Sequence, residues 1–210
     1  NQCDRNEVEK FTQQDHEIIY LSFNERGVGL NRNNSLMRAT GEFCLFADDD
    51  MRYVDNYPAI IEQCFDAHPF ADVIVFNIIE PDTKRYVIQK EHNVGYLNFM
   101  RYGAVRIAVR RQKIKEKGIF FHLCFGGGTE HSSGEDSLFL ADCLKHGLKI
   151  VAVPISIAEL TEERESTWFT GYTDKYFIDK GCLYAAMSPK LKKLLCLQDA
   201  IRHSKEYDRK

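Results

Sequence analysis

Short apolar runs alternate with amphipathic stretches along most of the chain. Continuous or period-two apolar runs predict strands at residues 16–23, 42–47, 71–79, 104–109 and 149–153, the last ended by Pro154. Apolar residues at helical spacing predict helices at residues 31–40, 57–68, 135–146 and 189–207. Weaker patterns predict a strand at 85–89 and a short helix at 96–102. Strands that alternate with helices at this spacing predict a layered α/β sheet.

The most informative single feature is a run of three acids, Asp48, Asp49 and Asp50, directly after the apolar run at 43–46. Adjacent carboxylates repel one another, so a positive partner among them is favoured. A hard divalent cation shared with a phosphate suits oxygen ligands, and open α/β sheets bind ligands beyond the carboxyl ends of their strands. A solvated acidic turn after a strand explains the same residues about equally well.

A second acidic pair, Glu135 and Asp136, opens the helix predicted at 135–146. The helix dipole alone favours acids in a first turn, by about 0.3–1 kcal/mol each. The pair also follows a glycine-rich loop at 125–134, which can close over a ligand. A carboxylate between such a loop and a helix is well placed to act as a general base.

The segment GVGLNRNNSL, residues 27–36, carries Arg32 near the start of a predicted helix. A guanidinium and the N–H groups of a helix N-terminus both suit a diphosphate. An arginine on a helix is also commonly just solvated, so this segment is weak evidence when taken alone.

Composition limits the remaining choices. With 210 residues, 44% of them hydrophobic and 28% charged, the chain is typical of one globular domain with an appendage. The net charge of −3 argues against bulk nucleic-acid binding. No apolar run approaches the roughly 20 residues that span a bilayer. The seven cysteines are scattered and form no CxxC pair, which indicates reduced thiols in a cytoplasmic protein and neither disulfides nor zinc.

Taken in order, three segments resemble the inverting nucleotide-sugar glycosyltransferases of family 2, which have the GT-A fold. The segments are GVGLNRNN (27–34), GEFCLFADDD (41–50) and SGEDSLFLADCLKHGLKIVAVP (133–154). The chain looks most similar to bacterial members that build surface polysaccharides or lipopolysaccharide. The resemblance implies an open mixed α/β sheet flanked by helices in residues 1–158. Residues 159–210 would form a C-terminal extension with an acceptor-side loop and an amphipathic helix.

The resemblance also implies a role for each motif residue. Asp50 matches a ligand of Mn²⁺ or Mg²⁺, and Asp48 matches a residue that contacts the metal through water or the ribose. Asp49 would face the ribose, and Arg32 with Asn33 would lie at the nucleobase and diphosphate. Asp136 matches the catalytic base. Glu135 would support the acceptor or its loop.

Family members normally begin with a strand and a helix that precede the first segment of this chain. The resemblance therefore implies an N-terminally incomplete sheet and weak nucleotide binding by this chain alone. Asn1, Gln2 and Asp4 are candidates for the remaining base-binding edge.

Several features beyond the motifs bear on the acceptor. Leucines and lysines give residues 189–207 a basic amphipathic pattern, which fits either an anionic membrane carrying lipid-linked acceptors or packing on the protein's own domain. The expected location is the cytoplasm, at the inner face of the membrane if the first alternative holds. The aromatic side chains of Trp168, Phe169 and Tyr172 fit acceptor stacking or core packing. Histidines in such positions more often have surface or loop roles, and His131 is the best placed of them to contact the leaving phosphate or the acceptor.

The leading hypothesis is metal-dependent, inverting transfer of a sugar from a nucleotide-diphosphate sugar to a hydroxyl of a carbohydrate or lipid-linked acceptor. Two alternatives stay open. A nucleotidyltransferase also uses an α/β sheet, acids and a metal, but it needs a basic glycine-rich loop that this chain does not show. A non-catalytic carbohydrate-binding remnant of the fold is the other, although the presence of both acidic motifs argues against it.

Overall fold

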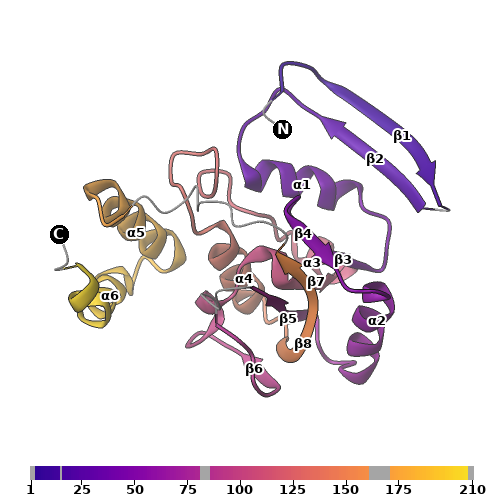
Figure 1. The fold of residues 1–210 in the computed structure, drawn as a ribbon. Helices are drawn as coiled ribbons and strands as arrows, with labels where there is room; N and C mark the ends of the chain where they lie inside the picture. The colour runs from indigo at the N-terminus through magenta and orange to yellow at the C-terminus, as the bar shows by residue number, and fades with distance from the viewer. Residues whose placement is uncertain (1–2, 15, 81–85, 161–170, 208–210) are drawn as a thin grey trace. The chain divides into compact units, whose positions relative to one another are not determined.

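The computed structural model describes residues 3–14, 16–80, 86–160 and 171–207. Its chain divides into two compact units (Figure 1). The first unit comprises residues 1–31, 122–138 and 166–210, and the second unit comprises residues 32–121 and 139–165. The predicted boundary at residue 158 stays a prediction.

The second unit contains the mixed sheet that the sequence predicts. Its strands are β3 (Phe43–Leu45), β4 (Met51–Tyr53), β5 (Val73–Ile79), β6 (His92–Val94), β7 (Ile107–Arg110) and β8 (Ile150–Leu160). The strand order is β3-β7-β5-β8-β4, with β6 also paired to β8. The β5–β8 pair is parallel and the other pairs are antiparallel, so the sheet is mixed as expected.

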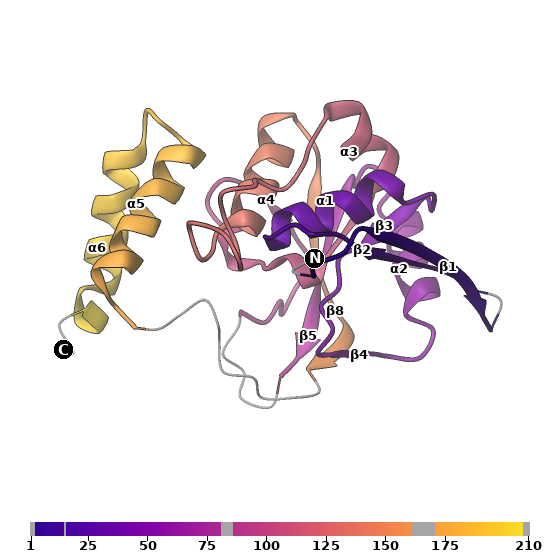
Figure 2. The ribbon, with the colours of Figure 1, turned by 90° about the horizontal axis from the view of Figure 1, so that it is seen from above.

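The central strand β5 is apolar except for Asn77, and its first four residues are buried on both faces of the sheet. Ile74 and Phe76 pack in one cluster with Ile61 and Phe65 of helix α2 (Tyr57–Ala67). The alternate residue Val75 points to the opposite face and is equally buried. Helix α4 (Glu135–Lys145) lies on the side of the sheet away from α2 in both ribbon views (Figures 1 and 2). A continuous apolar run is the expected pattern of a strand in this position.

The strand after α4 continues past the proline that the sequence analysis takes as its end. The register of β8 against β5 shifts between Val75 and Asn77, which pair with Ala152 and Ser156. This irregularity accommodates Pro154, so that β8 resumes pairing and reaches Leu160. The prediction that Pro154 ends the strand is therefore wrong.

Several short elements also differ from the sequence-based expectations. In the strand expected at 104–109, the first three residues form the short 3-10 helix η2 (Ala104–Arg106), and strand β7 follows it. The helix expected at 96–102 is reduced to the short 3-10 helix η1 (Phe99–Arg101). The described part of the strand expected at 85–89 is irregular. Helix α3 (Arg111–Lys117) was not expected, because charged residues dominate its sequence RQKIKEK.

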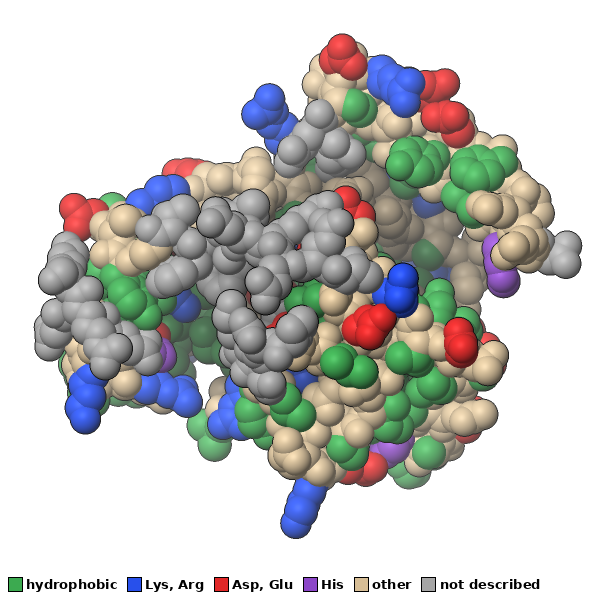
Figure 3. Space-filling view, viewed as in Figure 1, with side chains coloured by type: hydrophobic (Ala, Val, Ile, Leu, Met, Phe, Trp, Pro, Cys, Tyr) green, Lys and Arg blue, Asp and Glu red, His purple; other side chains and the backbone are tan. Residues whose placement is uncertain are grey.

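The first unit contains a two-stranded antiparallel hairpin of β1 (Glu7–Gln13) and β2 (His16–Ser22). Its apolar side chains include Val8, Phe11 and Tyr20, which are all exposed. The space-filling view shows hydrophobic side chains among charged ones on this hairpin (Figure 3). The same unit also contains α5 (Asp174–Met187) and α6 (Lys192–Tyr207), which pack side by side (Figure 2). Among the described helices, none combines the length and the hydropathy needed to span a bilayer.

Helix α1 (Val28–Arg38) is fixed to the second unit by a buried amide. Asn33 donates from its Nδ2 to the carbonyl of Phe121 at 2.9 Å, and its Oδ1 accepts the Phe121 N–H at 2.8 Å. Asn33 therefore supplies a donor and an acceptor to one peptide segment, as a neighbouring strand would. Such a pairing sets the position of the helix along its axis.

Replacing Asn33 with alanine is expected to lower the free energy of unfolding by about 2–4 kcal/mol, because it leaves the Phe121 N–H and C=O buried without partners. Urea denaturation measures the change. Asn31→Ala is the matched control, since Asn31 is exposed on the same helix and its loss should cost less than about 0.5 kcal/mol. Equal losses in the two variants would contradict a structural role for the Asn33 amide.

Candidate active site

The three consecutive acids lie where the sequence places them, in the connection from β3 to β4. Asp48 and Asp49 are exposed, and Asp50 is half-buried. The guanidinium of Arg32 reaches this connection, and its Nη2 lies 3.1 Å from Asp48 Oδ1. The side chain of Arg32 is only 11% exposed, against 45% for Asp48. The positive partner expected among the acids is therefore this arginine, and the structure brings two of the predicted site residues into contact.

Arg32 is held by packing as well as by charge. Its guanidinium carbon lies 5.4 Å from the ring centroid of Phe121, a cation–π contact. Because α1 begins at Val28, three residues earlier than the sequence analysis expects, Arg32 lies in the second turn of the helix. The first-turn N–H of Val28 donates to Gly127 O at 3.0 Å. One of the helix N–H groups expected at the diphosphate is thus used by the chain itself.

An aromatic cluster of Phe46, Phe121 and Phe139 joins three segments of the second unit. The rings of Phe121 and Phe139 stack at 4.4 Å, and Phe46 meets each of them edge-on at 4.9 and 5.4 Å. Phe46 precedes Asp48 by two residues, and Phe139 lies three residues after Asp136. Stacked and edge-to-face aromatic pairs each contribute about 0.5–1.5 kcal/mol beyond the burial of their area.

The acids offer the oxygen ligands that a hard cation prefers, but they do not form a complete cage. No group of three or more His, Cys, Asp or Glu side chains in the described part of the chain is placed to hold a metal ion. Mg²⁺ typically takes one or two carboxylates and completes its shell with water and substrate phosphates. Asp48 and Asp50 as ligands in that mode, with a diphosphate supplying the remaining ligands, stay a prediction.

In the first unit, the glycine-rich loop packs against the second acidic pair. The Gly126 N–H donates to His131 O at 2.8 Å and closes the loop. Gly126 has φ +99°, and a Cβ at this position would lie 2.5 Å from Val28 Cγ1 and 2.7 Å from Glu135 Cδ. Only glycine fits between the start of α1 and the carboxyl group of Glu135. The loop, the N-terminus of α1 and the start of α4 therefore meet at Gly126.

Asp136 lies in the first turn of α4, as predicted, and is half-buried. Its Oδ1 accepts the N–H of Ser137 at 2.7 Å. The N-terminal end of a helix favours the charged form of a carboxylate, and an ionised carboxylate is the form that accepts a proton. The position of Asp136, in the first turn of the helix that follows the glycine-rich loop, is the predicted one, and its role as a general base stays a prediction.

The structure adds one acid that the sequence analysis missed. Asp179 on α5 is buried, and its Oδ1 lies 3.0 Å from Nδ1 of His131, the histidine singled out in the loop. The available sequence signal is one acid in the otherwise mixed stretch DKYFIDKG, which is too weak to locate a partner. Trp168 and Phe169 lie outside the described residues. Tyr172 packs edge-on against Tyr207, at 4.9 Å between ring centroids.

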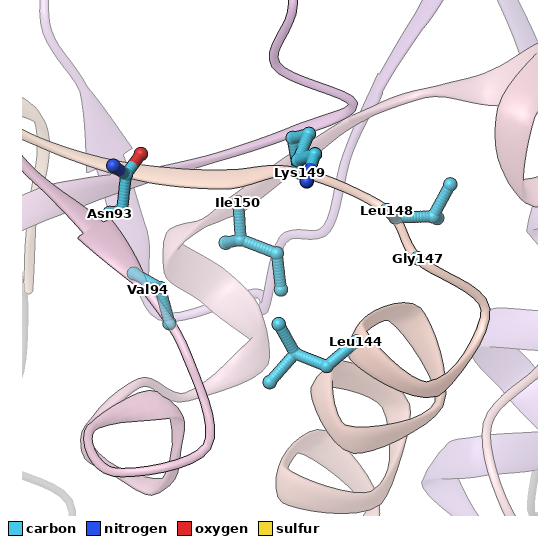
Figure 4. Close-up of a pocket in the computed structure, with 7 residues that line it drawn as sticks. All are labelled: Asn93, Val94, Leu144, Gly147, Leu148, Lys149 and Ile150. Carbon is cyan, nitrogen blue, oxygen red and sulfur yellow. The ribbon is translucent and has the colours of Figure 1, made fainter.

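A surface pocket of about 500 Å³ is lined in part by Leu144, near the C-terminal end of α4 (Figure 4). Its lining includes Val94, Leu144 and Ile150, with Asn93 and Lys149 at its edge, and no Asp or Glu. Because Leu144 is at the C-terminal end of α4, this pocket is separate from the predicted catalytic residues.

The predicted site residues are divided between the two units. Arg32, Asn33 and the acids at 48–50 belong to the second unit, whereas Glu135 and Asp136 belong to the first. Asn33 is buried in its pairing with Phe121, so its observed role is to position α1. A contact of Asn33 with the nucleotide stays a prediction.

Comparison with known structures supports the GT-A fold. S. aureus TarS 1–349 in complex with UDP matches with a TM-score of 0.57 and 20% sequence identity, over 84% of this chain and 51% of TarS 1–349. A second structure of S. aureus TarS gives a TM-score of 0.55 and 20% identity, over 83% of this chain and 31% of that one. A third, of TarS 1–349, gives 0.53 and 18%, over 84% and 51%. The chain thus spans about half the length of TarS 1–349.

A search of curated protein sequences found no match. The family model for glycosyl transferase family 2 matches residues 4–129, which is more than half of the chain. This range contains the Arg32 helix, the acids at 48–50 and the first part of the glycine-rich loop. The expected family and fold are confirmed, and they favour glycosyl transfer over the nucleotidyltransferase alternative. The chain belongs to glycosyl transferase family 2.

Proposed function

We propose that this protein transfers a sugar from a nucleotide-diphosphate sugar to an acceptor hydroxyl, with inversion at the anomeric carbon. The observation that carries the proposal is the ion pair of Arg32 with Asp48 at the end of β3, within a chain of this family. A fixed guanidinium next to a group of carboxylates offers both a positive partner for a diphosphate and oxygen ligands for a cation. The acceptor class implied by the resemblance is a polysaccharide or a lipid-linked carbohydrate.

Each of the predicted residues near β3 has its own role in binding the donor. Arg32 binds the negative charge of the diphosphate, and Asp49 contacts the ribose. Asp48 and Asp50 would hold Mn²⁺ or Mg²⁺, which when bound supplies Lewis-acid stabilisation of the leaving diphosphate.

Asp136 accepts the proton of the acceptor hydroxyl as its oxygen bonds to the anomeric carbon and the bond to the diphosphate breaks. Attack from the face opposite the leaving group inverts the configuration. No covalent intermediate with the protein forms. Glu135 supports the acceptor loop through its contact with Gly126.

Replacing Asp136 with asparagine is expected to lower kcat by about 10²-fold or more, because the amide cannot accept the proton. The KM for the donor should stay within about twofold, since the base does not bind the donor. Turnover of a panel of nucleotide sugars, with and without Mn²⁺, measures both constants.

Asp142→Asn is the matched control for this experiment. Asp142 lies on the same helix and forms a surface ion pair with Lys145 at 3.0 Å. Its loss should leave kcat unchanged. Full turnover in the Asp136→Asn variant would rule out the assigned base. Absence of turnover in the unmodified protein with every donor would instead favour a non-catalytic, carbohydrate-binding role.

Replacing Gly126 with alanine is expected to lower kcat by about tenfold or more, because a Cβ there displaces Glu135 or Val28 and strains the backbone. Gly127→Ala is its control, since a Cβ at Gly127 has no atom within 4 Å. Steady-state kinetics on the two variants compares neighbouring residues of one loop. Similar turnover in both would show that the loop tolerates displacement at Gly126.

Helix α6 supports contact with an anionic membrane, where lipid-linked acceptors are found. The residues on its half-buried side are Leu195, Asp199, His203 and Tyr207. Three of these four are polar, and Asp199 accepts hydrogen bonds from Tyr184 at 2.8 Å and Tyr207 at 2.6 Å. The helix therefore packs on α5 mainly through a polar stripe.

The apolar stripe of α6 is on its exposed side. Leu194, Leu197 and Ile201 are 60%, 56% and 68% exposed. On a helical wheel Lys193 and Arg202 flank this stripe on either side, which is the arrangement of helices that lie in a membrane interface. The alternative of a helix packed on its own domain describes only the polar side of α6.

Replacing both Leu194 and Ile201 with glutamine is expected to weaken binding to vesicles that contain phosphatidylglycerol by about tenfold or more, because two apolar side chains no longer enter the interface. Co-sedimentation with these vesicles and with neutral phosphatidylcholine vesicles measures the effect. Leu97→Gln is the control, since Leu97 is 99% exposed outside this helix. Equal binding of all three proteins to both kinds of vesicle would exclude a role of the apolar stripe of α6 in membrane contact.

A further inference from the structure

The described part of the first unit contains a buried, extensively hydrogen-bonded carboxylate that the proposed mechanism does not use. Asp179 on α5 is only 6% exposed. Its Oδ1 lies 3.0 Å from His131 Nδ1, and its Oδ2 accepts the Ser132 N–H at 3.2 Å and the Ser132 hydroxyl at 3.1 Å. The Lys175 ammonium donates to both oxygens at 3.0 Å. A carboxylate accepts only, so His131 carries its proton on Nδ1 in this contact.

These donors keep Asp179 charged. Burial raises the pKa of Asp179, but the hydrogen bonds from His131, Lys175 and Ser132 outweigh burial and bring the pKa down to about 2. The charged form of Asp179, which accepts these hydrogen bonds, therefore predominates at neutral pH. The contacts weaken as the pH falls from about 4 toward 2 and Asp179 takes up a proton.

The same helix contacts the loop at a second point, one turn further on. Gly134 has φ +112°, and a Cβ at this position would lie 2.7 Å from Leu183 Cδ1. Lys175 adds a third contact, since its ammonium donates to Glu130 O at 2.7 Å. Helix α5 therefore fixes residues 130–134, and Glu135 and Asp136 follow directly in the chain.

We propose that Asp179 is a positioning residue for glycosyl transfer, which acts through His131 and Ser132 to hold the loop that places the general base Asp136. The proposal rests on the function proposed above. It makes α5 part of the catalytic apparatus, although the sequence analysis assigns this segment to an extension. A displacement of about 1 Å at a catalytic group can cost up to about 10²-fold in rate, so an anchor this close to the base has a kinetic consequence.

Asp179→Asn tests the proposal, because the amide keeps the size of the side chain but loses its charge and one acceptor. The expected result is a fall in kcat of about tenfold or more with a donor KM within about twofold of the unmodified protein. Asp179→Glu should recover part of the loss because it restores the charge. Asp174→Asn is the matched control, since Asp174 is exposed in the first turn of α5. Its kcat should be unchanged.

A melting curve of each variant identifies any that fails to fold. If Asp179→Asn does not fold, Ser132→Ala decides, because it removes only the hydroxyl contact with Asp179. A lower kcat with unchanged donor KM then supports the proposal, and an unchanged kcat overturns it.

Asp136→Asn in the same series separates the two proposals. Loss of turnover in Asp136→Asn together with full turnover in Asp179→Asn overturns the positioning role alone. Full turnover in Asp136→Asn overturns the assigned base, and with it the role of Asp179.

Discussion

The aromatic cluster of Phe46, Phe121 and Phe139 is the packing contact on which the arrangement of the motifs in the second unit depends. Each ring belongs to a different segment. Phe46 directly follows β3, Phe121 is the residue that pairs with Asn33, and Phe139 belongs to helix α4. Three rings in mutual contact fix these segments relative to one another through non-directional burial and ring geometry. The polar contacts of the second unit form between segments that this packing holds in place.

The charged side chains of the site in the second unit are positioned by short, specific contacts. Arg32 lies over Phe121 and pairs with Asp48, so one guanidinium joins the aromatic cluster to the acids. This ion pair offsets part of the repulsion among the three adjacent carboxylates. The proposed diphosphate site is at this guanidinium, in a chain that belongs to glycosyl transferase family 2.

The C-terminal helices show that amphipathicity does not by itself say which face of a helix is covered. Helix α6 turns its polar side, with Asp199 at the centre, toward α5 and leaves Leu194 and Leu197 exposed. Helix α5 in turn directs Asp179 and Leu183 to the loop before Glu135. One helix thus packs against the loop before the predicted base, and the other leaves an apolar stripe exposed.

Much of the fold follows from local pattern, because apolar periodicity determines the type of an element. The continuous run of β5 predicts a strand covered on both faces, and the structure has one. Elements without a clear apolar pattern were missed, such as the charged α3 and the exposed β1. The bulge of β8 at Pro154 was also missed, because a proline ends or bends a strand according to how its neighbours pair.

The sequence by itself determined the family, the acids at the end of a strand and the acidic pair at the start of a helix, since each depends on residues adjacent in the chain. Only the tertiary structure decided that Asn33 pairs with Phe121, 88 residues away, and that Asp179 anchors Ser132, 47 residues away. It likewise decided which side of α6 is covered. A polar group pairs with whichever donor or acceptor packing brings next to it. Packing brings together segments that are far apart in the sequence, and nothing in either segment indicates the contact.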